Sequence, residues 1–560
     1  MQKYSSLFLF LIISTFSFAQ TRPRTGSQPE NKKVADTIPQ KTVIVTSAFT
    51  PTLKKSAKIN FSAGTPLPDT ERPSFQYNVP AQNLFFTYES PALKPLAASI
   101  DSMVHWENSN FVKVGYGNFT TPYLQAGISL GDGVHSVLNV FGKYTSSKGP
   151  LPFQQFSKTG LQAIGIFNNE KNTQEWMGSL HYDGSTQYEY GFQPDTLIFT
   201  KDQLRQRFSS FGGKLGVRNK TLNAANISYN PSLSLGLFSD NHNGTETNFI
   251  LNAPISKSFG KIFAFDLGLT ADITSFKGDT STINNNLYYL TPSVKFKTPN
   301  FILSAGLRPS WDNQVFSMLP NFSAEARIQD EKFILVAGWI GYFNKTTYEY
   351  LAGLNPWIQQ PTGLLNTRMT EQYAGFKGSA GSHFTYNAKV SFIKYNNQPL
   401  FLNDSITGRS FNVVNESTMK GIRLHAELGY TWQEKVSLLA GATFNQYSGL
   451  EINDKAWGLV PLQLTGTLRW QVFKDFLVKG DVFFWDGAPY QDVMKESHKL
   501  DPAIDLNAGV EFTILPKLNA WVQLNNLFNN KYQRWNQYPV LGFNVQAGVI
   551  YSFSQLGITK

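Results

Sequence analysis

From residue 110 to residue 553 the chain repeats one pattern, in which apolar and polar residues alternate one by one. Between Gly421 and Trp432, for example, Ile422 and Leu424 fall on one face and polar or charged residues fall on the other. A period of two residues is that of a β-strand. The segments are about 9–14 residues long, which suits tilted strands that cross a bilayer.

Two further features favour a transmembrane barrel over a soluble sandwich. The apolar faces end in aromatic residues, such as Tyr430, Trp432, Trp470 and Phe553, as is typical of membrane interfaces. Connections alternate between short and long, and only 16% of the residues are charged, against about 25% in soluble domains. Because a bilayer offers no partner to an open sheet edge, such strands must close into a barrel.

Short polar turns give the number of strands. Ten of them contain the Gly, Asn, Asp or Pro that a tight reversal needs. With both barrel ends on the periplasmic side, ten such turns predict an all-β fold, a transmembrane antiparallel β-barrel of about 22 strands, with 20 or 24 as alternatives. The ten turns are residues 131–133, 169–172, 219–223, 257–261, 297–300, 330–332, 381–383, 433–435, 474–475 and 516–517.

The N-terminal part differs from the rest. Residues 1–19 have a basic residue, Lys3, an apolar run and a small-x-small cleavage site, and so predict a signal peptide. Ten of the 28 prolines fall between positions 21 and 100, which predicts a short extended N-terminal segment over 20–108. We therefore divide the chain into 1–19, 20–108 and a barrel over 109–560.

The C-terminal part resembles a known family. The run Asn525–Tyr532, NNLFNNKY, is similar to the penultimate-strand motif of TonB-dependent receptors, and a last strand with an aromatic near its end follows. The resemblance implies a 22-stranded barrel for passage of a solute or polymer across the outer membrane. Family plugs are larger than residues 20–108, so the chain resembles a receptor whose plug is reduced or missing, and this segment is predicted to be a plug remnant in the periplasm or in the lumen. Residues 36–48 resemble the segment that precedes such plugs, and the strand that couples to an energy source is expected over 36–45.

No catalytic chemistry is predicted. The chain has no cysteine, which excludes thiolate zinc sites and cysteine nucleophiles. Gly127–Gly131 matches G-x-S-x-G, but it lies in a strand and not at a strand-to-helix elbow. The seven histidines form no H-x-x-x-H pair, and no long basic run favours nucleic acid. We expect no enzyme activity, no metal site and no cofactor.

Two sets of residues are candidates for binding. Charged residues on the polar strand faces line either a ligand path through the lumen or a bracing network of ion pairs: Arg423, Glu427, Arg469, Lys479, Asp481 and Glu511. Aromatic residues in the long connections 185–192, 346–361 and 529–539 either bind a glycan or a protein, or pack on each other. The best single candidates there are Tyr350, Trp357, Trp535 and Tyr538.

Two functions remain open at this point. One is passage through the barrel, with outer-membrane lipids around it and a TonB-type energy coupler as a candidate partner. The other is a scaffold or accessory subunit that binds other outer-membrane proteins or surface lipoproteins, for secretion, lipoprotein display or barrel assembly. Both place the chain as an integral protein in the outer membrane of a Gram-negative bacterium, with the N-terminal segment periplasmic.

Overall fold

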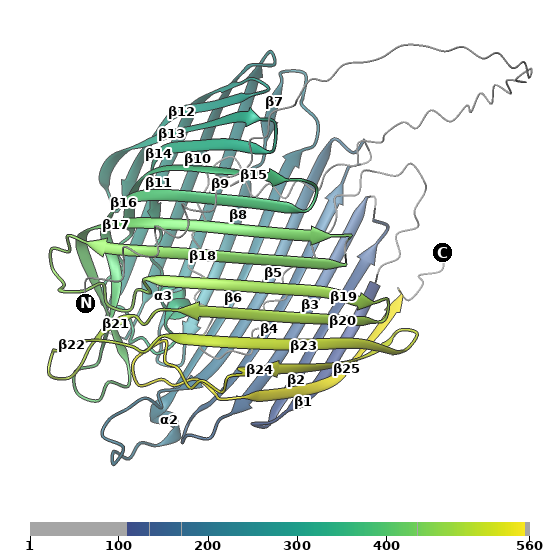
Figure 1. Ribbon diagram of the computed structural model, residues 1–560. Coiled ribbons are helices and arrows are strands. Elements are labelled where there is room, and N and C mark those ends of the chain that lie inside the picture. The colour runs from purple at the N-terminus through teal and green to yellow at the C-terminus, as the bar shows by residue number, and fades with distance from the viewer. Residues whose placement is uncertain (1–108, 134, 170, 280, 434, 555–560) are drawn as a thin grey trace, which may run out of the picture. The chain divides into compact units, whose positions relative to one another are not determined.

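The alternating segments form one antiparallel sheet that closes on itself (Figure 1). The computed structural model describes residues 109–133, 135–169, 171–279, 281–433 and 435–554. The predicted signal peptide, the segment 20–108 and the coupling segment 36–45 lie outside these residues.

Nearly all described elements are strands. The first half contains β1 Ser109–Gly117, β2 Thr121–Gly131, β3 Ser136–Lys148, β4 Gln155–Asn168, β5 Gln174–Tyr188, α2 Lys201–Leu204, β6 Arg205–Asn219, β7 Ile227–Tyr229, β8 Ser232–Asp240, β9 Thr245–Phe259, β10 Phe263–Lys277, β11 Thr282–Lys297 and β12 Phe301–Asp312. The second half contains β13 Val315–Gln329, β14 Phe333–Asn344, α3 Tyr348–Leu354, β15 Thr367–Ala380, β16 Phe384–Asn403, β17 Phe411–Trp432, β18 Val436–Ser448, β19 Leu462–Phe473, β20 Phe476–Trp485, β21 Pro489–Gln491, β22 Ser497–Lys499, β23 Ala503–Leu515, β24 Leu518–Asn525 and β25 Asn544–Ser554.

The sheet is closed by the pairing of its first and last strands. β1 pairs with β25 from Ser109 opposite Ser554 to Gly117 opposite Gln546. The sheet holds 23 strands, but β7 and β8 both pair with β9 and are separated only by Asn230 and Pro231. Proline has no N–H for the ladder and interrupts the strand there. Counting β7 and β8 as one position gives 22, so the predicted strand number is confirmed.

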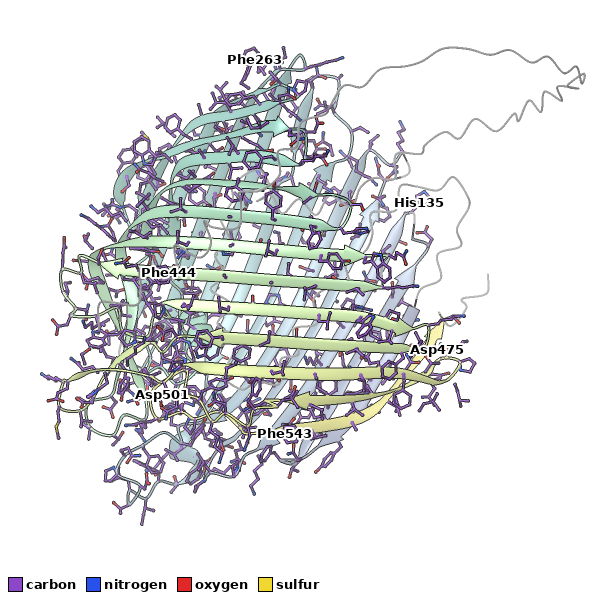
Figure 2. All side chains as sticks on the ribbon, viewed as in Figure 1. His135, Phe263, Phe444, Asp475, Asp501 and Phe543 are labelled. Carbon is purple, nitrogen blue, oxygen red and sulfur yellow. The ribbon has the colours of Figure 1, made fainter. Side chains whose placement is uncertain are left out.

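All ten predicted turns connect strands at one end of the barrel. His135 and Asp475 mark this end in Figure 2, and Asp501 and Phe543 mark the end with the long connections. Strand lengths differ from the prediction of 9–14 residues, since β16 and β17 reach 20 and 22 residues. Their outer parts pair with each other, Gln398 opposite Glu416 through Asn403 opposite Phe411, and this hairpin lengthens both strands.

The outward face of the barrel is apolar, as a bilayer requires. Leu424, Leu428 and Trp432 on β17 are exposed on this face, as the alternation predicts. At the short-turn end the exposed residues include the aromatic side chains of Phe167, Trp176, Phe263, Phe384 and Trp470. Such a girdle is expected where a barrel meets the membrane interface.

Among the described residues, no helix has the length and apolar character needed to cross a membrane.

Candidate functional site at the outer mouth of the barrel

The largest buried cluster of the barrel lies at the end with the long connections, and we call it the cap cluster. Its members come from both the barrel wall and two connections, 345–366 and 526–543. The wall supplies Phe208 from β6, Phe238 from β8, Phe276 from β10, Phe401 from β16 and Phe411 from β17. Since β10 and β16 are separated in the sheet by β11 through β15, a cluster that contacts both must cross the inside of the barrel.

The connection 345–366 contributes more residues to the cap cluster than any other single segment of the chain. It supplies Tyr348, Leu351, Ala352, Trp357, Ile358 and Leu364. Its helix α3 starts after Thr347, whose side chain accepts a hydrogen bond from the N–H of Tyr350. This is the usual cap for a short helix, because the first N–H groups have no partner within the helix. In Figure 1, α3 lies on the left, at the same end of the barrel as β21 and β22.

The first turn of α3 is held by carboxylates of the barrel wall. Glu246 on β9 accepts hydrogen bonds from the backbone N–H groups of Tyr348, at 2.6 Å, and of Glu349, at 3.1 Å. The Tyr348 hydroxyl donates to Asp240 at the end of β8, at 2.8 Å. The hydroxyl of Ser210 on β6 donates to the Glu349 carboxylate. Because the first N–H groups of a helix have no partner within it, these hydrogen bonds satisfy the start of α3 and fix it against the wall.

A buried polar joint fixes the start and the end of the same connection. The side chains of Asn285 on β11 and Asn366 donate to each other's oxygens, at 2.9 and 2.7 Å. Asn366 also accepts from the backbone N–H of Thr346. Lys345 forms a buried ion pair with Asp272 on β10, at 3.7 Å. These groups are satisfied only when 345–366 is seated in the barrel, so opening it exposes each of them.

The middle of the connection reaches the opposite wall. The indole N–H of Trp357 donates to the carbonyl of Tyr188, the last residue of β5, at 3.0 Å. Gln187 donates to the carbonyl of Pro356 at 2.9 Å. The connection leaves from β14, and β6 through β13 lie between β5 and β14 in the sheet. The chain therefore spans the mouth of the barrel.

Three of the four predicted aromatic candidates are buried in the cap cluster. Trp357 and Tyr538 are 0% exposed, and Trp535 is 2% exposed. Trp357 and Tyr538 stack with ring centroids 3.9 Å apart, and Trp535 packs edge-on against Phe401. Tyr350 is half-buried beside the cluster. In this closed arrangement the candidates contact one another, which is the packing alternative of the sequence analysis; binding by them remains a prediction.

One predicted loop boundary is wrong. Residues 185–188 were expected in an outer loop, but they form the last residues of β5, paired with β6. The connection begins at Glu189, whose carboxylate faces the guanidinium of Arg409 at 3.4 Å. Burial raises the pKa of Glu189 to about 7, Arg409 opposes this rise, and Asp404 adds to it. This pair joins the connection 189–204 to the connection 404–410.

A small cavity lies under the cap cluster. Its volume is about 60 Å³, and Tyr350, Tyr395, Arg423, Arg534 and Trp535 are among its lining residues. Pockets that bind small molecules are usually about 300–1,000 Å³. This cavity is therefore too small for such a ligand.

The lumen candidates line the inner wall, and some of them are paired. Glu511 on β23 accepts from Lys479 on β20, at 3.0 Å, and from Lys113 on β1, at 3.1 Å. Glu427 lies 3.4 Å from the ring of His425. These contacts are of the bracing type, which neutralises charge in a wide lumen.

Three lumen candidates have other surroundings. Arg423 donates to the side chains of Asn445, at 2.8 Å, and Tyr395, at 3.1 Å. Arg469 lies opposite Lys479 in the ladder, and Asp481 lies opposite Thr467. The structure therefore brings Lys479 and Glu511 into direct contact and distributes the other candidates along β17, β19 and β20. A ligand path along them stays a prediction.

The residues that seat the connection were missed by the sequence analysis. Asp240, Glu246, Asn285 and Asn366 each lie within or beside a strand whose alternation is ordinary. Their partners are distant in the chain, so no local spacing marks them. The one available signal was the amide-rich run Asn284–Asn286, which is unusual within a strand.

A closed antiparallel barrel with 22 strand positions is a fold that this chain shares with solved structures of outer-membrane receptors and transporters. Solved structures similar to this chain include the FrpB iron transporter from Neisseria meningitidis, at 13% identity and a TM-score of 0.62, covering 80% of this chain and 81% of that one. Another is the pyoverdine outer membrane receptor FpvA from Pseudomonas aeruginosa, at 12% identity and a TM-score of 0.60, covering 80% and 79%.

A mutant of the ferric enterobactin receptor PfeA from Pseudomonas aeruginosa is similar to the same extent, at 12% identity and a TM-score of 0.60, covering 80% of this chain and 81% of that one. Comparisons with protein-family models and with curated proteins found no match. The likeness confirms the receptor-like barrel fold that the C-terminal motif implied.

Proposed function

We propose that this protein is an outer-membrane barrel for passage of a solute or polymer, and that its connection 345–366 closes the outer mouth. The observation that carries the proposal is the path of this connection from β14 across the lumen to β5. A barrel of this strand number encloses a wide lumen. A buried aromatic cluster and a set of buried polar joints across that lumen are what a closed gate needs.

The alternative function is supported by a different surface. A groove of about 1140 Å³ lies on the outer side between the connection 449–461 and the β21–β22 hairpin. Its lining is mixed: apolar residues such as Leu450 and Ile452 alternate with charged residues, which include Glu451, Asp454, Lys455 and Lys499. A scaffold or accessory subunit would use such a surface to hold a surface lipoprotein or another outer-membrane protein. Stoichiometric co-purification from outer membranes in mild detergent, lost when the groove is altered, would favour this function.

Gating can be tested by removing the connection. Residues 346–361 are replaced by a short Gly-Ser linker, in the full chain and in a chain that also lacks 21–108. If 345–366 is a gate, single-channel conductance in planar bilayers rises in one or both variants. The second deletion matters because 20–108 is itself proposed to fill the lumen. Conductance that stays at the native level in the double deletion would contradict passage.

Locking the connection gives the converse experiment. The side chain of Gln359 donates to the Ser410 hydroxyl at 2.9 Å, and the chain has no cysteine of its own. In the variant Gln359→Cys/Ser410→Cys, a short thiol-reactive crosslinker joins the connection 345–366 to the end of the connection 404–410, directly before β17. We expect the crosslinked protein to lose uptake that the two single-cysteine variants retain. Equal uptake before and after crosslinking would show that this connection is not the gate.

We also propose that an energy coupler of the TonB type acts on residues 36–45, which lie outside the described residues. The support is the resemblance of this segment and the receptor-like fold. Replacing 36–45 with a Gly-Ser sequence of equal length should abolish energised uptake and leave barrel assembly intact. Uptake that persists after the replacement, and is insensitive to loss of the proton gradient, would contradict coupling.

A further inference from the structure

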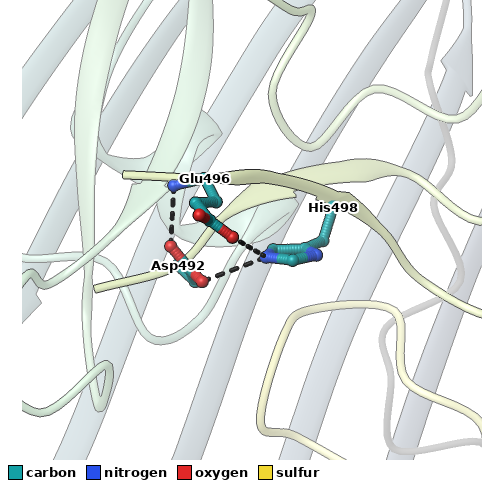
Figure 3. A group of neighbouring side chains, drawn as sticks. All are labelled: Asp492, Glu496 and His498. Atoms are coloured by element: carbon teal, nitrogen blue, oxygen red, sulfur yellow. Dashed lines mark hydrogen bonds and ion pairs between the residues drawn. The ribbon is translucent and has the colours of Figure 1, made fainter. Parts of the chain in front are cut away.

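Three possible metal-ligand atoms lie close together at the end of the barrel with the long connections, and they belong to Asp492, Glu496 and His498 (Figure 3). They lie in the connection 486–502, which forms the hairpin of β21 and β22. The Nε2 atom of His498 is 3.0 Å from Oδ2 of Asp492 and 3.9 Å from Oε2 of Glu496. All three atoms lie within 4.8 Å of one another.

The hairpin turn orients the Asp492 carboxylate. Its Oδ1 atom accepts hydrogen bonds from the backbone N–H groups of Met494, at 2.9 Å, and Glu496, at 2.8 Å. The backbone N–H of Asp492 donates to the carbonyl of Glu496 at 3.1 Å and closes the turn. Because the backbone occupies Oδ1, Oδ2 is left directed toward the imidazole. Contacts of this kind orient metal ligands before an ion arrives.

The imidazole is positioned from the other strand of the hairpin. His498 is the middle residue of β22 and lies opposite Tyr490 in the β21–β22 ladder. The two rings have centroids 5.5 Å apart, so Tyr490 covers one side of the imidazole. The Nε2 edge remains directed at the two carboxylates (Figure 3).

We propose that Asp492, Glu496 and His498 bind a divalent transition-metal ion, with Zn²⁺ as the best fit. Tetrahedral zinc with bonds of about 2.0–2.1 Å places neighbouring ligand atoms about 3.3–3.4 Å apart. The observed 3.0 and 3.9 Å lie on either side of this value, so small side-chain rotations are sufficient. An imidazole together with two carboxylates suits Zn²⁺ or Mn²⁺ better than Ca²⁺ or Mg²⁺, which prefer oxygen ligands alone.

Three protein ligands leave one zinc coordination position open. His498 also lines the outer groove between 449–461 and the hairpin. A bound ion would therefore present this open position at the edge of the groove, to water or to a donor atom of a molecule captured from outside. Paired histidines, the usual sequence signal of a zinc site, are absent from this segment: the set has a single histidine with two carboxylates in D-x-x-x-E-x-H spacing.

The competing explanation of this cluster is a simple ion pair between His498 and the two carboxylates. A measurement of metal binding distinguishes a metal site from such an ion pair. The full chain is purified in detergent without a histidine tag and titrated with Zn²⁺ by calorimetry, and with Co²⁺ by visible absorption. We expect one equivalent to bind to the native chain. His498→Ala and Asp492→Asn should each weaken binding at least 10-fold, and Glu496→Gln should weaken it less.

Two control variants keep the result interpretable. Ser497→Ala lies on the same hairpin, and His242→Ala removes an exposed histidine from the connection between β8 and β9; neither should change the affinity. Each variant is checked for barrel folding by its heat-dependent shift on gels. Equal Zn²⁺ binding by the native, His498→Ala and Asp492→Asn chains overturns the proposal, and so does a native chain that binds no Zn²⁺. Neither outcome bears on passage through the barrel.

Discussion

Trp357 and Tyr538 stack face to face inside the outer mouth, with ring centroids 3.9 Å apart and planes at 26°. They come from connections that follow β14 and β24, and the Tyr538 hydroxyl donates to the carbonyl of Arg409 in a third connection. Tyr190 from a fourth connection packs edge-on against both rings. The stack therefore ties four connections together at the centre of the cap cluster.

Removing the indole should loosen the mouth without unfolding the barrel. Trp357 is fully buried, and truncation of a buried tryptophan to alanine costs about 3–5 kcal/mol. In Trp357→Ala we expect faster hydrogen exchange in 345–366 and 526–543 and a higher conductance. Trp176→Ala, on the exposed outward face, is the matched control and should leave both measurements unchanged. Unaltered exchange in Trp357→Ala would mean that the stack does not hold the mouth closed.

The joint between Glu189 and Arg409 predicts a dependence of the closed mouth on pH. Burial raises the pKa of Glu189 from its ordinary value of 4.5 to about 7. The closed state therefore prefers the neutral acid. Burying the ionised Glu189 carboxylate costs free energy. This cost is absent below pH 4.5, grows between pH 4.5 and 7 and is complete above pH 7, so the closed mouth becomes less stable as the pH rises. The whole effect is at most about 3 kcal/mol.

Hydrogen exchange of 404–410 and 526–543 at pH 5 and pH 8, corrected for the intrinsic rate, measures this dependence. Exchange should be faster at pH 8 in the native chain. Glu189→Gln should make the corrected rates alike. Asp202→Asn removes an exposed carboxylate from the same connection and should preserve the native difference. A difference that persists in Glu189→Gln would assign the dependence to another group.

The sequence predicted the barrel well because residues along a strand of a membrane barrel face the lipid and the lumen in turn, so apolar and polar side chains alternate. The alternation around Arg423, the ten turns and the closing strand follow from local pattern and are confirmed. The closed mouth could not be predicted from local sequence pattern. Glu246 and the start of α3 are more than a hundred positions apart, and only the closed sheet brings them together.

The four aromatic candidates also show that local sequence pattern does not predict contacts between distant parts of the chain. A tryptophan such as Trp357 in a long connection is typical both of a binding surface and of a buried cluster that closes a lumen. Which of the two applies depends on whether the connection extends outward or folds into the lumen. That choice rests on distant polar partners, such as Asn285 for Asn366, and not on the aromatic residues themselves.

The buried pair of Lys345 and Asp272 should show strong coupling. Removing one partner of a buried ion pair costs about 3–5 kcal/mol, because a charge is left without compensation. Lys345→Met and Asp272→Asn should therefore each increase exchange in 345–366. The double variant should cost less than the sum of the two single variants. A double-mutant cycle on local exchange free energies measures this, and strict additivity would show that the two side chains act independently.

Closure of the sheet itself depends on glycine at the seam between β1 and β25. A Cβ on Gly548 would lie 1.9 Å from the carbonyl oxygen of Val114, which is backbone and cannot move away. At Gly115, the neighbouring space is filled by the ring of Trp521, whose N–H donates to the same carbonyl at 3.1 Å. Gly548→Ala must therefore separate the two strands or distort the ladder, and we expect a large loss of folded barrel. Gly165→Ala on β4, where the nearest atom to a new Cβ is 3.9 Å away, should assemble normally. The heat-dependent shift on gels compares the two variants, and equal assembly would show that the seam opens to accept a methyl group.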